Sequence, residues 1–399
     1  MLCIFVCAIS NSEAKMEMIR RYFSDPGGSF FLFGPRGTGK STWLRGEFGN
    51  ALYLDLLSPG LYRTLTAKPE RLREYLKGDP EKKTIIIDEV QKIPSLLDVI
   101  HQVIEEKTGE RFILTGSSSR KLKRSGVDLL AGRALIKTMH PFIASELGGY
   151  FEMNTALEYG MLPLVYNSDN KEQTLQAYID LYINEEVRSE GYVRNMENFF
   201  RFLEVISFSN GSVINASEIA RESSIGRKAV EGYISILEDI LLAFRLPVFT
   251  KKAKRHLIAS PKFYFFDAGV YKAIRPSGPL DKPEEINGIA LETLVCQHLS
   301  AWCSYSKEKY GLYFWRTKSG NEVDFVIYGN DNIRAIEVKH SRTIRSKDIS
   351  GLRSFKEDYP MAQCILLYMG EEKIKRGDIL FIPCMEFLKN LKPDDIPVK

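Results

Sequence analysis

The stretch Gly34-Pro-Arg-Gly-Thr-Gly-Lys-Ser41 decides how the first part of this chain folds. It directly follows an apolar run, Phe30–Phe33, and leads into a segment with helical character that begins near Lys40. Glycines at positions 34, 37 and 39 let the backbone curl, so that its amide groups and the amino end of the helix face one small volume. Such a loop favours phosphate groups, and it predicts a strand, a phosphate-binding loop and a helix in that order.

The loop pattern GxxxxGK(S/T) assigns a role to two side chains. Lys40 is expected to reach the β- and γ-phosphates of ATP, and the Ser41 hydroxyl to bind the accompanying Mg²⁺. The other residues that we expect to contact the nucleotide are Gly34, Pro35, Arg36, Gly37, Thr38, Gly39 and Thr42. The alternative is a glycine-rich turn that only caps a helix, but this pattern arises by chance in roughly one of a hundred chains of this length.

A second apolar strand, in the run TIIIDE, delivers Asp88 and Glu89 to its carboxyl end. Ligands of open parallel sheets bind at that edge. Asp88 is expected to hold Mg²⁺ through its water shell, and Glu89 to orient the water that attacks the γ-phosphate. An acidic pair after a strand is usually a helix cap or a solvated turn, but the phosphate loop upstream favours the catalytic interpretation.

Short apolar runs alternate with helical segments from residue 29 to about residue 140, as in a parallel sheet covered by helices on both faces. A third strand ends in Thr115-Gly-Ser-Ser-Ser119. Ser117, or in second place Thr115, is predicted to contact the γ-phosphate. Simple capping of the next helix is an equally good interpretation of these small polar residues.

The composition is that of an ordinary globular protein, with 44% hydrophobic and 27% charged residues. A length of 399 residues predicts two or three domains. The net charge of +4 neither requires nor excludes a polyanionic partner. Six cysteines without a CxxC pair argue against a zinc site or a disulfide framework, and a reducing cytoplasm fits best.

The start of the chain has no predicted function. The apolar run Leu2–Ile9 is too short to cross a bilayer, and no positive charge precedes it as a signal peptide requires, so we expect no membrane association. Met16 and Met18 stand just before a predicted first helix, MIRRYF, and a start at either is a hypothesis.

The order of segments predicts an α/β protein with a helical middle. The predicted parts are an extension without a role (1–15), a P-loop ATPase core (16–145), a helical lid or connector (146–205), a helix-turn-helix with a wing (206–275) and a further α/β domain (276–399).

The chain resembles the prokaryotic AAA-type ATPases of unassigned function that join a P-loop core to a nuclease-like C-terminal domain. The resemblance rests on GPRGTGKS, IIIDEVQKIP, LTGSSSRKLKRSGVDLLAGRA, the MHPF…E stretch at 139–146 and RTKSGNEVDF…AIEVKHS. It implies an AAA-like core, ATP as the ligand, and Arg133 of LLAGRA as a γ-phosphate sensor or intersubunit finger. An isolated arginine is more often a surface ion-pair partner. Ring assembly is common among such relatives, so a homo-oligomer is an open expectation.

A hairpin is predicted near the end of the chain, where two strands flank Asn330–Asp331. Its register places Asp324 directly opposite Glu337, and side-chain alternation puts Lys339 on the same face. The other face is expected to be filled by Val323, Phe325, Ile336 and Val338.

Two carboxylates and a lysine in this geometry can hold a divalent cation and a nucleophilic water beside a phosphodiester. This is the PD-(D/E)xK nuclease arrangement, and the resemblance adds Glu292 as a fourth acidic residue. The alternative is an exposed polar face in which Glu322 pairs with Lys339. A one-residue slip of the hairpin would separate Asp324 from Glu337.

Three basic clusters, Arg120–Arg124, Lys251–His256 and Arg342–Lys347, suit a phosphate backbone together, although each alone is typical of a solvated surface. Arg227 and Lys228, at the start of the second helix of the helix-turn-helix, are candidate DNA contacts. The leading hypothesis is an AAA-type ATPase that acts on or near DNA. One alternative is a nucleotide-dependent switch whose C-terminal domain binds a partner without cutting. The other is an ATPase that remodels a protein.

Overall fold

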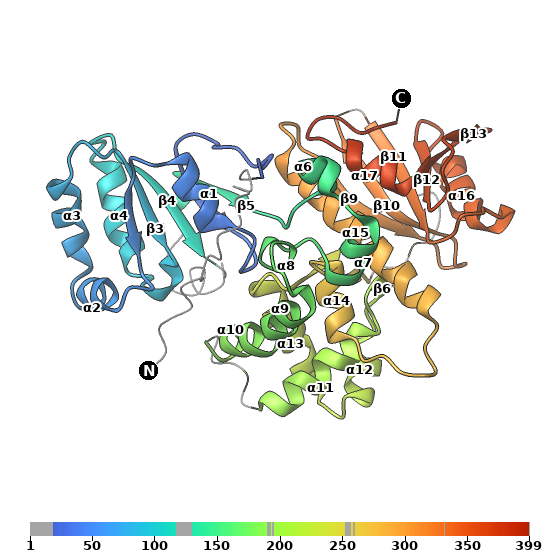
Figure 1. Ribbon diagram of the computed structural model, residues 1–399, viewed down its shortest axis with the longest axis horizontal. Helices are drawn as coiled ribbons and strands as arrows, with labels where there is room; N and C mark the ends of the chain where they lie inside the picture. Colours follow the sequence, from blue (N-terminus) through green and yellow to red (C-terminus); the bar gives the residue numbers. More distant parts are fainter. Residues whose placement is uncertain are drawn as a thin grey trace.

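The computed structural model describes residues 19–116, 130–189, 193, 195–251, 257, 260–330 and 332–398. An α/β part coloured blue to teal stands at one end, an α/β part coloured orange to red at the other, and a mainly helical green and yellow part joins them (Figure 1). The mixed α/β class with a parallel sheet core, predicted from the sequence, is confirmed.

The first sheet is wholly parallel, with the strand order β2-β3-β4-β1-β5. Its central strands are apolar on both faces, and Ile85, Ile86 and Ile87 are completely buried, because helices cover both sides. The strands are β1 (Ser29–Phe33), β2 (Leu52–Asp55), β3 (Thr84–Asp88), β4 (Arg111–Gly116) and β5 (Ala134–Thr138). The helices are α1 (Lys40–Glu47), α2 (Pro59–Ala67), η1 (Pro69–Arg71), α3 (Leu72–Gly78), η2 (Val90–Lys92), α4 (Leu96–Glu105) and η3 (Leu130–Gly132).

The parallel register brings three predicted segments to the same edge of this sheet. Phe33 at the end of β1 pairs with Gly116 of β4, and Ile87 of β3 pairs with Leu114 of β4. The phosphate loop, the acid pair and the end of β4 therefore follow neighbouring strands at their carboxyl ends.

The middle part contains two small helical groups and a three-stranded sheet of order β6-β8-β7. A helix, a turn, a second helix and two strands follow one another between residues 216 and 265, in the predicted order. The elements are α6 (Ala144–Leu147), η4 (Gly148–Tyr150), α7 (Met153–Tyr159), α8 (Pro163–Tyr166), α9 (Lys171–Ala177), the π-helix η5 (Tyr178–Ile183), α10 (Asn184–Ser189), α11 (Met196–Ser207), β6 (Ser212–Val213), α12 (Ala216–Glu222), α13 (Arg227–Asp239), β7 (Ala243–Leu246), β8 (Lys262–Phe265) and α14 (Ala268–Ile274).

The C-terminal part is a long helix against a six-stranded sheet of order β13-β14-β12-β11-β10-β9. Its first three strands form an antiparallel meander, and α16 then leads to β12, which lies parallel to β11. The elements are α15 (Pro283–Tyr305), β9 (Gly311–Arg316), β10 (Glu322–Gly329), β11 (Asn332–Lys339), η6 (Ser346–Ile349), α16 (Ser350–Asp358), β12 (Gln363–Tyr368), β13 (Ile374–Arg376), β14 (Ile379–Pro383) and α17 (Cys384–Asn390).

The predicted hairpin register is confirmed between Phe325↔Ile336 and Gly329↔Asn332. One face assignment was wrong. Val323 packs in a different apolar cluster from Phe325, Ile336 and Val338. The reason is a register shift between Val323 and Val326, because a bulge changes the phase of side-chain alternation along a strand.

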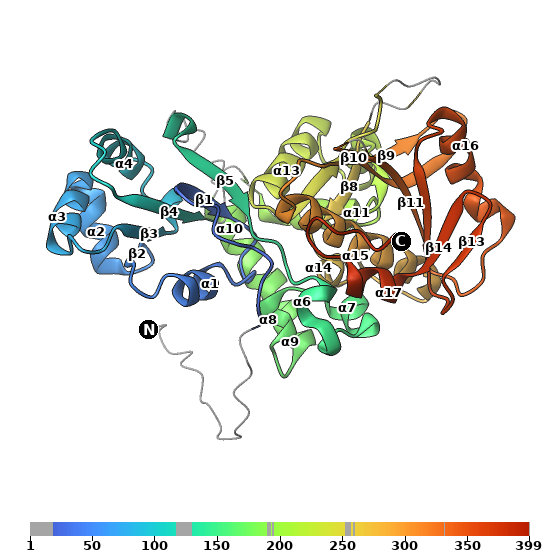
Figure 2. The same cartoon turned by 90° about the horizontal axis from the view of Figure 1, so that it is seen from above.

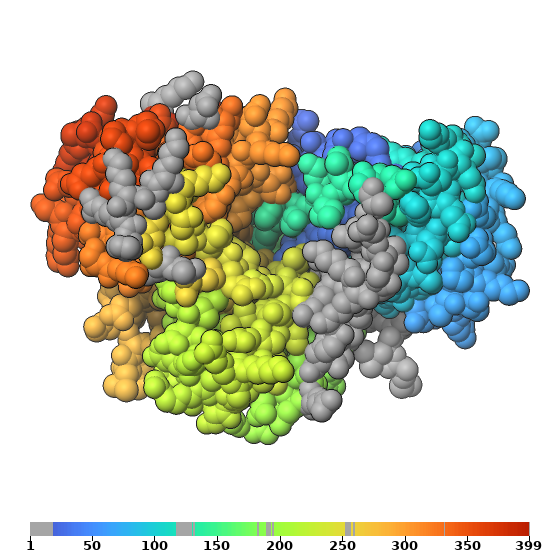
Figure 3. Space-filling model, turned by 180° about the vertical axis from the view of Figure 1, so that it is seen from behind, coloured from blue at the N-terminus to red at the C-terminus, as the bar shows by residue number. Residues whose placement is uncertain are grey.

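The middle and C-terminal parts share one apolar core, which runs from Phe142 to Ile396. In Figure 2 helix α15 lies between the helices of the middle part and the C-terminal sheet, and in Figure 3 the yellow surface of the middle part lies directly against the orange C-terminal part. The predicted boundaries at 205/206 and 275/276 therefore do not separate independent cores, whereas the first sheet has apolar clusters of its own.

The predicted helix at MIRRYF is not formed over its described residues, Ile19–Phe23. The backbone N–H of Tyr22 and the guanidinium of Arg21 instead bond to Glu146. These tertiary hydrogen bonds replace the local ones of a helix. Within the described part of the chain, no helix has the length and apolar character needed to span a membrane.

Candidate functional site

The loop after β1 has the backbone that its glycines allow. Gly37 and Gly39 lie in the left-handed region, at φ 82° and 86°, which other residues rarely adopt. A Cβ atom added to Gly34 would stand 2.5 Å from the carbonyl oxygen of Met139. Helix α1 begins at Lys40 directly after this turn, so its amino end opens onto the loop.

Lys40 is a buried cation at the centre of this loop. Its Nζ donates to the carbonyl oxygens of Gly34 and Pro35, at 2.6 and 3.1 Å. Burial lowers the pKa of this ammonium, and the charges of Glu89 and Asp88 act in the opposite direction. A phosphate group placed in the loop would compensate the poorly solvated charge, so the site is electrostatically suited to an anion.

Asp88 is also buried, at 4% exposure, and its carboxylate accepts hydrogen bonds from three neutral hydroxyl groups. The Ser41 hydroxyl donates to Asp88 Oδ2 at 2.9 Å. The Tyr53 hydroxyl donates to the same oxygen, and Thr115 Oγ1 donates to Oδ1. Burial and this hydrogen bond raise the pKa of Tyr53. The two predicted halves of the ATP site thus meet through Ser41 and Asp88.

Glu89 is held by its neighbours in a strained backbone conformation, with φ at 61°. Its N–H donates to Thr115 Oγ1 at 3.2 Å, and Gln91 Nε2 donates to its carboxylate. Gln91 in turn packs against the end of β4, because a Cβ on Gly116 would lie 2.3 Å from Gln91 Oε1. The orientation of Glu89 therefore depends on Thr115 and Gln91.

Sequence reasoning missed Tyr53 and Gln91. Tyr53 lies within an ordinary apolar strand, and no motif signals its contact with Asp88. Gln91 lies inside the IIIDEVQKIP stretch but has no role in the common pattern. Thr115, the second choice for a phosphate contact, touches Asp88 instead, and Ser117 lies outside the described residues.

Arg133 lies at the wrong edge of the sheet for a sensor in the same chain. It immediately precedes β5, whose first residue, Ala134, pairs with Ser29 at the start of β1. A five-residue strand is roughly 16 Å long, so the phosphate loop is out of reach. Arg133 pairs with Glu105 at the end of α4. Its other predicted role, as an intersubunit finger, stays a prediction.

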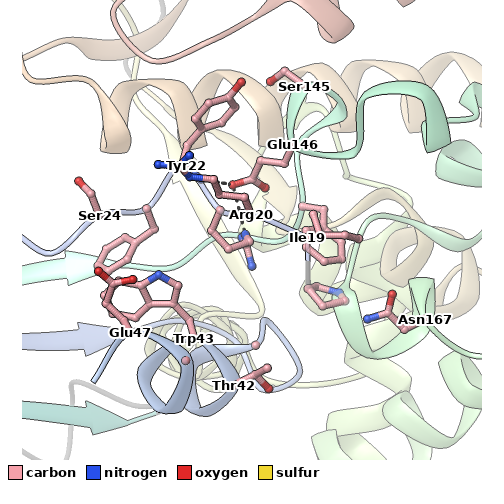
Figure 4. Close-up of a pocket in the computed structure, with 16 residues that line it drawn as sticks. Ile19, Arg20, Tyr22, Ser24, Thr42, Trp43, Glu47, Ser145, Glu146 and Asn167 are labelled. Atoms are coloured by element: carbon pink, nitrogen blue, oxygen red, sulfur yellow. Dashed lines mark hydrogen bonds and ion pairs between the residues drawn. The ribbon is translucent and has the colours of Figure 1, made fainter. Parts of the chain in front are cut away.

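A cavity of about 870 Å³ opens beside the loop (Figure 4). Its walls come from the segment Ile19–Ser24, from Gly39, Thr42 and Trp43, and from the start of the middle part. Figure 4 shows Glu146 reaching the segment Ile19–Ser24, where it accepts hydrogen bonds from the Arg21 side chain and the Tyr22 backbone. The cavity is continuous with the amino end of α1.

These residues fit Mg²⁺ and ATP. The glycine loop can surround phosphate oxygens, Lys40 can compensate their charge, and the cavity beside Thr42 has room for a base and a sugar. Ser41 and Asp88 supply the oxygen ligands that Mg²⁺ prefers.

The C-terminal carboxylates converge as predicted but meet an unexpected cation. Asp324 and Glu337 are 6% and 8% exposed, and Lys339 Nζ lies 2.5 Å from Glu337 Oε1. Lys262, from β8 of the middle part, points into the same site, where its Nζ lies 3.0 Å from Glu292 Oε1 and 3.5 Å from Asp324 Oδ1. Nothing in the sequence pattern signals this lysine.

The predicted nuclease metal does not fit these residues. Oxygens of Asp324 and Glu292 are taken by Lys262, and the second oxygen of Asp324 accepts the N–H of Val338 at 2.9 Å. Glu337 Oε2 is buried without a hydrogen-bond partner. Among the described residues, no three or more histidine, cysteine, aspartate or glutamate side chains are arranged to hold a metal ion.

The structure describes some of the basic residues that were predicted to contact DNA. Arg227 and Lys228 are exposed at the start of α13, and Arg227 pairs with Glu231 at 3.0 Å. Arg342–Lys347 is mostly exposed. The cluster Arg120–Arg124 and all but the first residue of Lys251–His256 lie outside the described residues.

Three family matches together cover most of the chain. Residues 27–148 match the AAA domain, residues 150–281 match the domain of unknown function DUF8612, and residues 287–387 match the domain of unknown function DUF4143. The amino-terminal part is therefore an AAA-type domain, a class of ATP-binding ATPase domains. No curated protein matches the sequence.

Three solved structures that match the chain are distant from it in sequence. Domain III of the Thermotoga maritima replication initiation protein DnaA is 17% identical, over 40% of this chain and 78% of that chain, with a TM-score of 0.25. C. elegans PCH-2 is 16% identical over 52% and 61%, with a TM-score of 0.21. Protein VC1899 from Vibrio cholerae is 11% identical over 91% and 96%, with a TM-score of 0.22. Scores this low carry no argument, so the assignment rests on the AAA match and the loop geometry.

Proposed function

We propose that this chain binds Mg²⁺ and ATP at the loop Gly34–Ser41 and hydrolyses the γ-phosphate. The observation that carries the proposal is the hydrogen bond of 2.9 Å between Ser41 Oγ and Asp88 Oδ2, because it joins the loop to the acidic strand end. The AAA domain match supports the same conclusion. The adenosine moiety then occupies the cavity beside Gly39 and Thr42.

Each residue has a part in the reaction. Lys40 binds the β- and γ-phosphates, and Ser41 and Asp88 hold Mg²⁺, which neutralises developing charge on the phosphate oxygens when bound. Glu89 orients a water and accepts its proton while the water oxygen bonds to the γ-phosphorus. The bond to the bridging oxygen breaks, and ADP and inorganic phosphate leave. Thr115 and Gln91 hold the acid pair in place.

The test compares three variants with the wild type. Lys40→Ala should lose ATP binding, because the buried cation in the loop is gone. Glu89→Gln should bind ATP normally and lose most of its turnover. The exposed Lys68→Ala serves as the control and should change neither. Normal ATP binding and turnover by Lys40→Ala would overturn the proposal.

We further propose that the middle part presents α13 to DNA in the manner of a winged helix. Exposed Arg227 and Lys228 at the start of this helix and the sheet order β6-β8-β7 support the proposal. A duplex-binding titration at several salt concentrations tests it. The double variant Arg227→Ala/Lys228→Ala should bind more weakly, with a salt slope reduced by about 1 to 2.

The DNA-binding titration, together with ATP turnover measured with and without DNA, also separates the DNA proposal from the two alternatives. If the wild type shows neither DNA binding at moderate salt nor DNA-stimulated turnover, the DNA proposal fails. A nucleotide-dependent switch or a protein-remodelling ATPase is then favoured.

We also propose a reducing compartment such as the cytoplasm, because the described cysteines 296, 303, 364 and 384 are all free thiols.

A further inference from the structure

The C-terminal carboxylate cluster already contains a cation supplied by the chain itself. Lys262 is almost completely buried, with 2% of its side chain exposed. Its Nζ lies 2.6 Å from Glu322 Oε1, 3.0 Å from Glu292 Oε1 and 3.5 Å from Asp324 Oδ1. Three carboxylates from α15 and β10 thus surround one ammonium group.

The backbone of Lys262 is fixed by pairing on both sides. It starts β8, the central strand of the small sheet, and pairs with Val213 of β6 and Leu246 of β7. The strand pairing thus fixes the position from which the buried lysine side chain reaches the carboxylates.

The two parts are joined by backbone pairing next to this site. After β7 the chain continues along the edge strand β9, where the N–H of Phe249 donates to the carbonyl of Phe314 at 2.7 Å. The N–H of Phe314 donates back to Pro247 at 3.1 Å. This pairing covers the edge of the C-terminal sheet and keeps β8 against the carboxylates.

Other contacts also occupy the carboxylate oxygens. The Tyr264 hydroxyl donates to Glu292 Oε1 at 2.6 Å, and Arg316 Nη1 lies 3.2 Å from Glu322 Oε2. The coulombic attraction of the three carboxylates raises the pKa of Lys262 above its ordinary value, although its burial acts the other way. Lys262 therefore remains an ammonium ion at neutral pH.

We propose that the Lys262 ammonium is the resident cation of this carboxylate site. It takes the place that a divalent metal ion would occupy beside Asp324. In this arrangement the chain does not hold Mg²⁺ or Mn²⁺ at the C-terminal site and does not cleave DNA there. The inference is independent of the ATP site, because none of its residues contacts the loop at Gly34–Ser41.

The experiment counts Mn²⁺ ions bound to the nucleotide-free full chain by electron paramagnetic resonance. In the wild type, Asp324→Asn should leave Mn²⁺ binding unchanged. Lys262→Met, which keeps an unbranched side chain only one heavy atom shorter and removes its charge, should gain one Mn²⁺ site per chain. The double variant Lys262→Met/Asp324→Asn should lose that site again, and Lys262→Arg, the matched control, should gain none.

Two results would overturn the proposal. One is the loss of a bound Mn²⁺ when Asp324→Asn is introduced into the wild type, because a metal ion would then bind there while Lys262 is present. The other is a folded Lys262→Met chain, with normal ATP binding, that gains no Mn²⁺. If Lys262→Met is only partly folded, its melting temperature is measured with and without Mn²⁺. A gained Mn²⁺ site must raise the melting temperature of Lys262→Met more than Mn²⁺ raises that of Lys262→Arg.

Discussion

Asp88 and Asp324 are both buried near the ends of strands, but different groups face them. Asp88 contacts the hydroxyls of Ser41, Tyr53 and Thr115, which are neutral. Asp324 contacts the ammonium of Lys262 and a backbone N–H. Asp324 is thus paired with a cation from the chain itself, whereas the hydroxyls that contact Asp88 carry no charge that would compensate a carboxylate. This contrast is the basis for proposing Mg²⁺ at the first site and none at the second.

The largest effect is expected from the same substitution at the two aspartates. Asp88→Asn should lower ATP turnover by about 10³-fold, because it removes charge from a group that holds Mg²⁺ near the transferred phosphate. Asp324→Asn should leave ATP turnover within about twofold of the wild-type rate. Steady-state phosphate release measures both. Equal losses in the two variants would break the comparison.

Removing the cation of the second site should cost stability. Lys262→Met leaves three carboxylates without their buried partner, and we expect a loss of about 3 to 5 kcal/mol in the free energy of unfolding. Urea unfolding without Mn²⁺ measures it. The exposed pair Lys282–Glu285 gives the control, since Lys282→Met should change the stability by less than about 1 kcal/mol. A Lys262→Met chain as stable as the wild type would contradict the proposed charge pairing.

His140 is a half-buried base near a cation, in contrast to the lysine that faces carboxylates. Burial and the neighbouring charge of Arg21 lower its pKa from 6.5 to about 4, so it is neutral in the folded chain at neutral pH. Between about pH 4 and 6.5 the unfolded chain binds the additional proton, so stability rises with pH in this window. The rise is on the order of 3 kcal/mol.

His140→Gln should remove the share of this rise that comes from His140, because glutamine does not titrate, and the share from His298, whose pKa burial also lowers to about 4, should remain. The free energy of unfolding, measured between pH 4 and 7, gives the slope of stability with pH. At pH 8, where histidine is neutral in both states, the difference between wild type and variant gives the loss of stability that does not depend on titration. An unchanged slope would show that His140 is not the group that is responsible.

The smallest effect concerns the neutral donors of the first site. Thr115→Val keeps the shape of the side chain but removes the hydroxyl that bonds to Asp88 and accepts the N–H of Glu89. We expect turnover to fall by about tenfold with little change in ATP affinity. Thr108→Val, before the amino end of β4, is the matched control and should have no effect. A fall in affinity without a fall in turnover would contradict a positioning role.

Features that depend on local pattern were predictable. The phosphate loop, the acid pair and the parallel sheet follow from glycine spacing and apolar runs, and the hairpin register follows from its turn at Asn330–Asp331. Features that depend on a bulge or on a distant segment were not. Val323 lies on the other face because the strand changes phase, and Ile19–Phe23 is not helical because Glu146 binds it.

The AAA-type loop, its acidic partner strand and the convergence of Asp324 with Glu337 were readable from the residues, because a motif, an apolar strand or a hairpin turn fixes each of them. The groups that contact those acids could be identified only in the folded chain. Tyr53 reaches Asp88 from a neighbouring strand, and Lys262 reaches Asp324 from another part of the chain. Periodicity predicts the face of a strand on which a side chain lies. The charged group that contacts it there depends on packing between segments that are distant in the sequence.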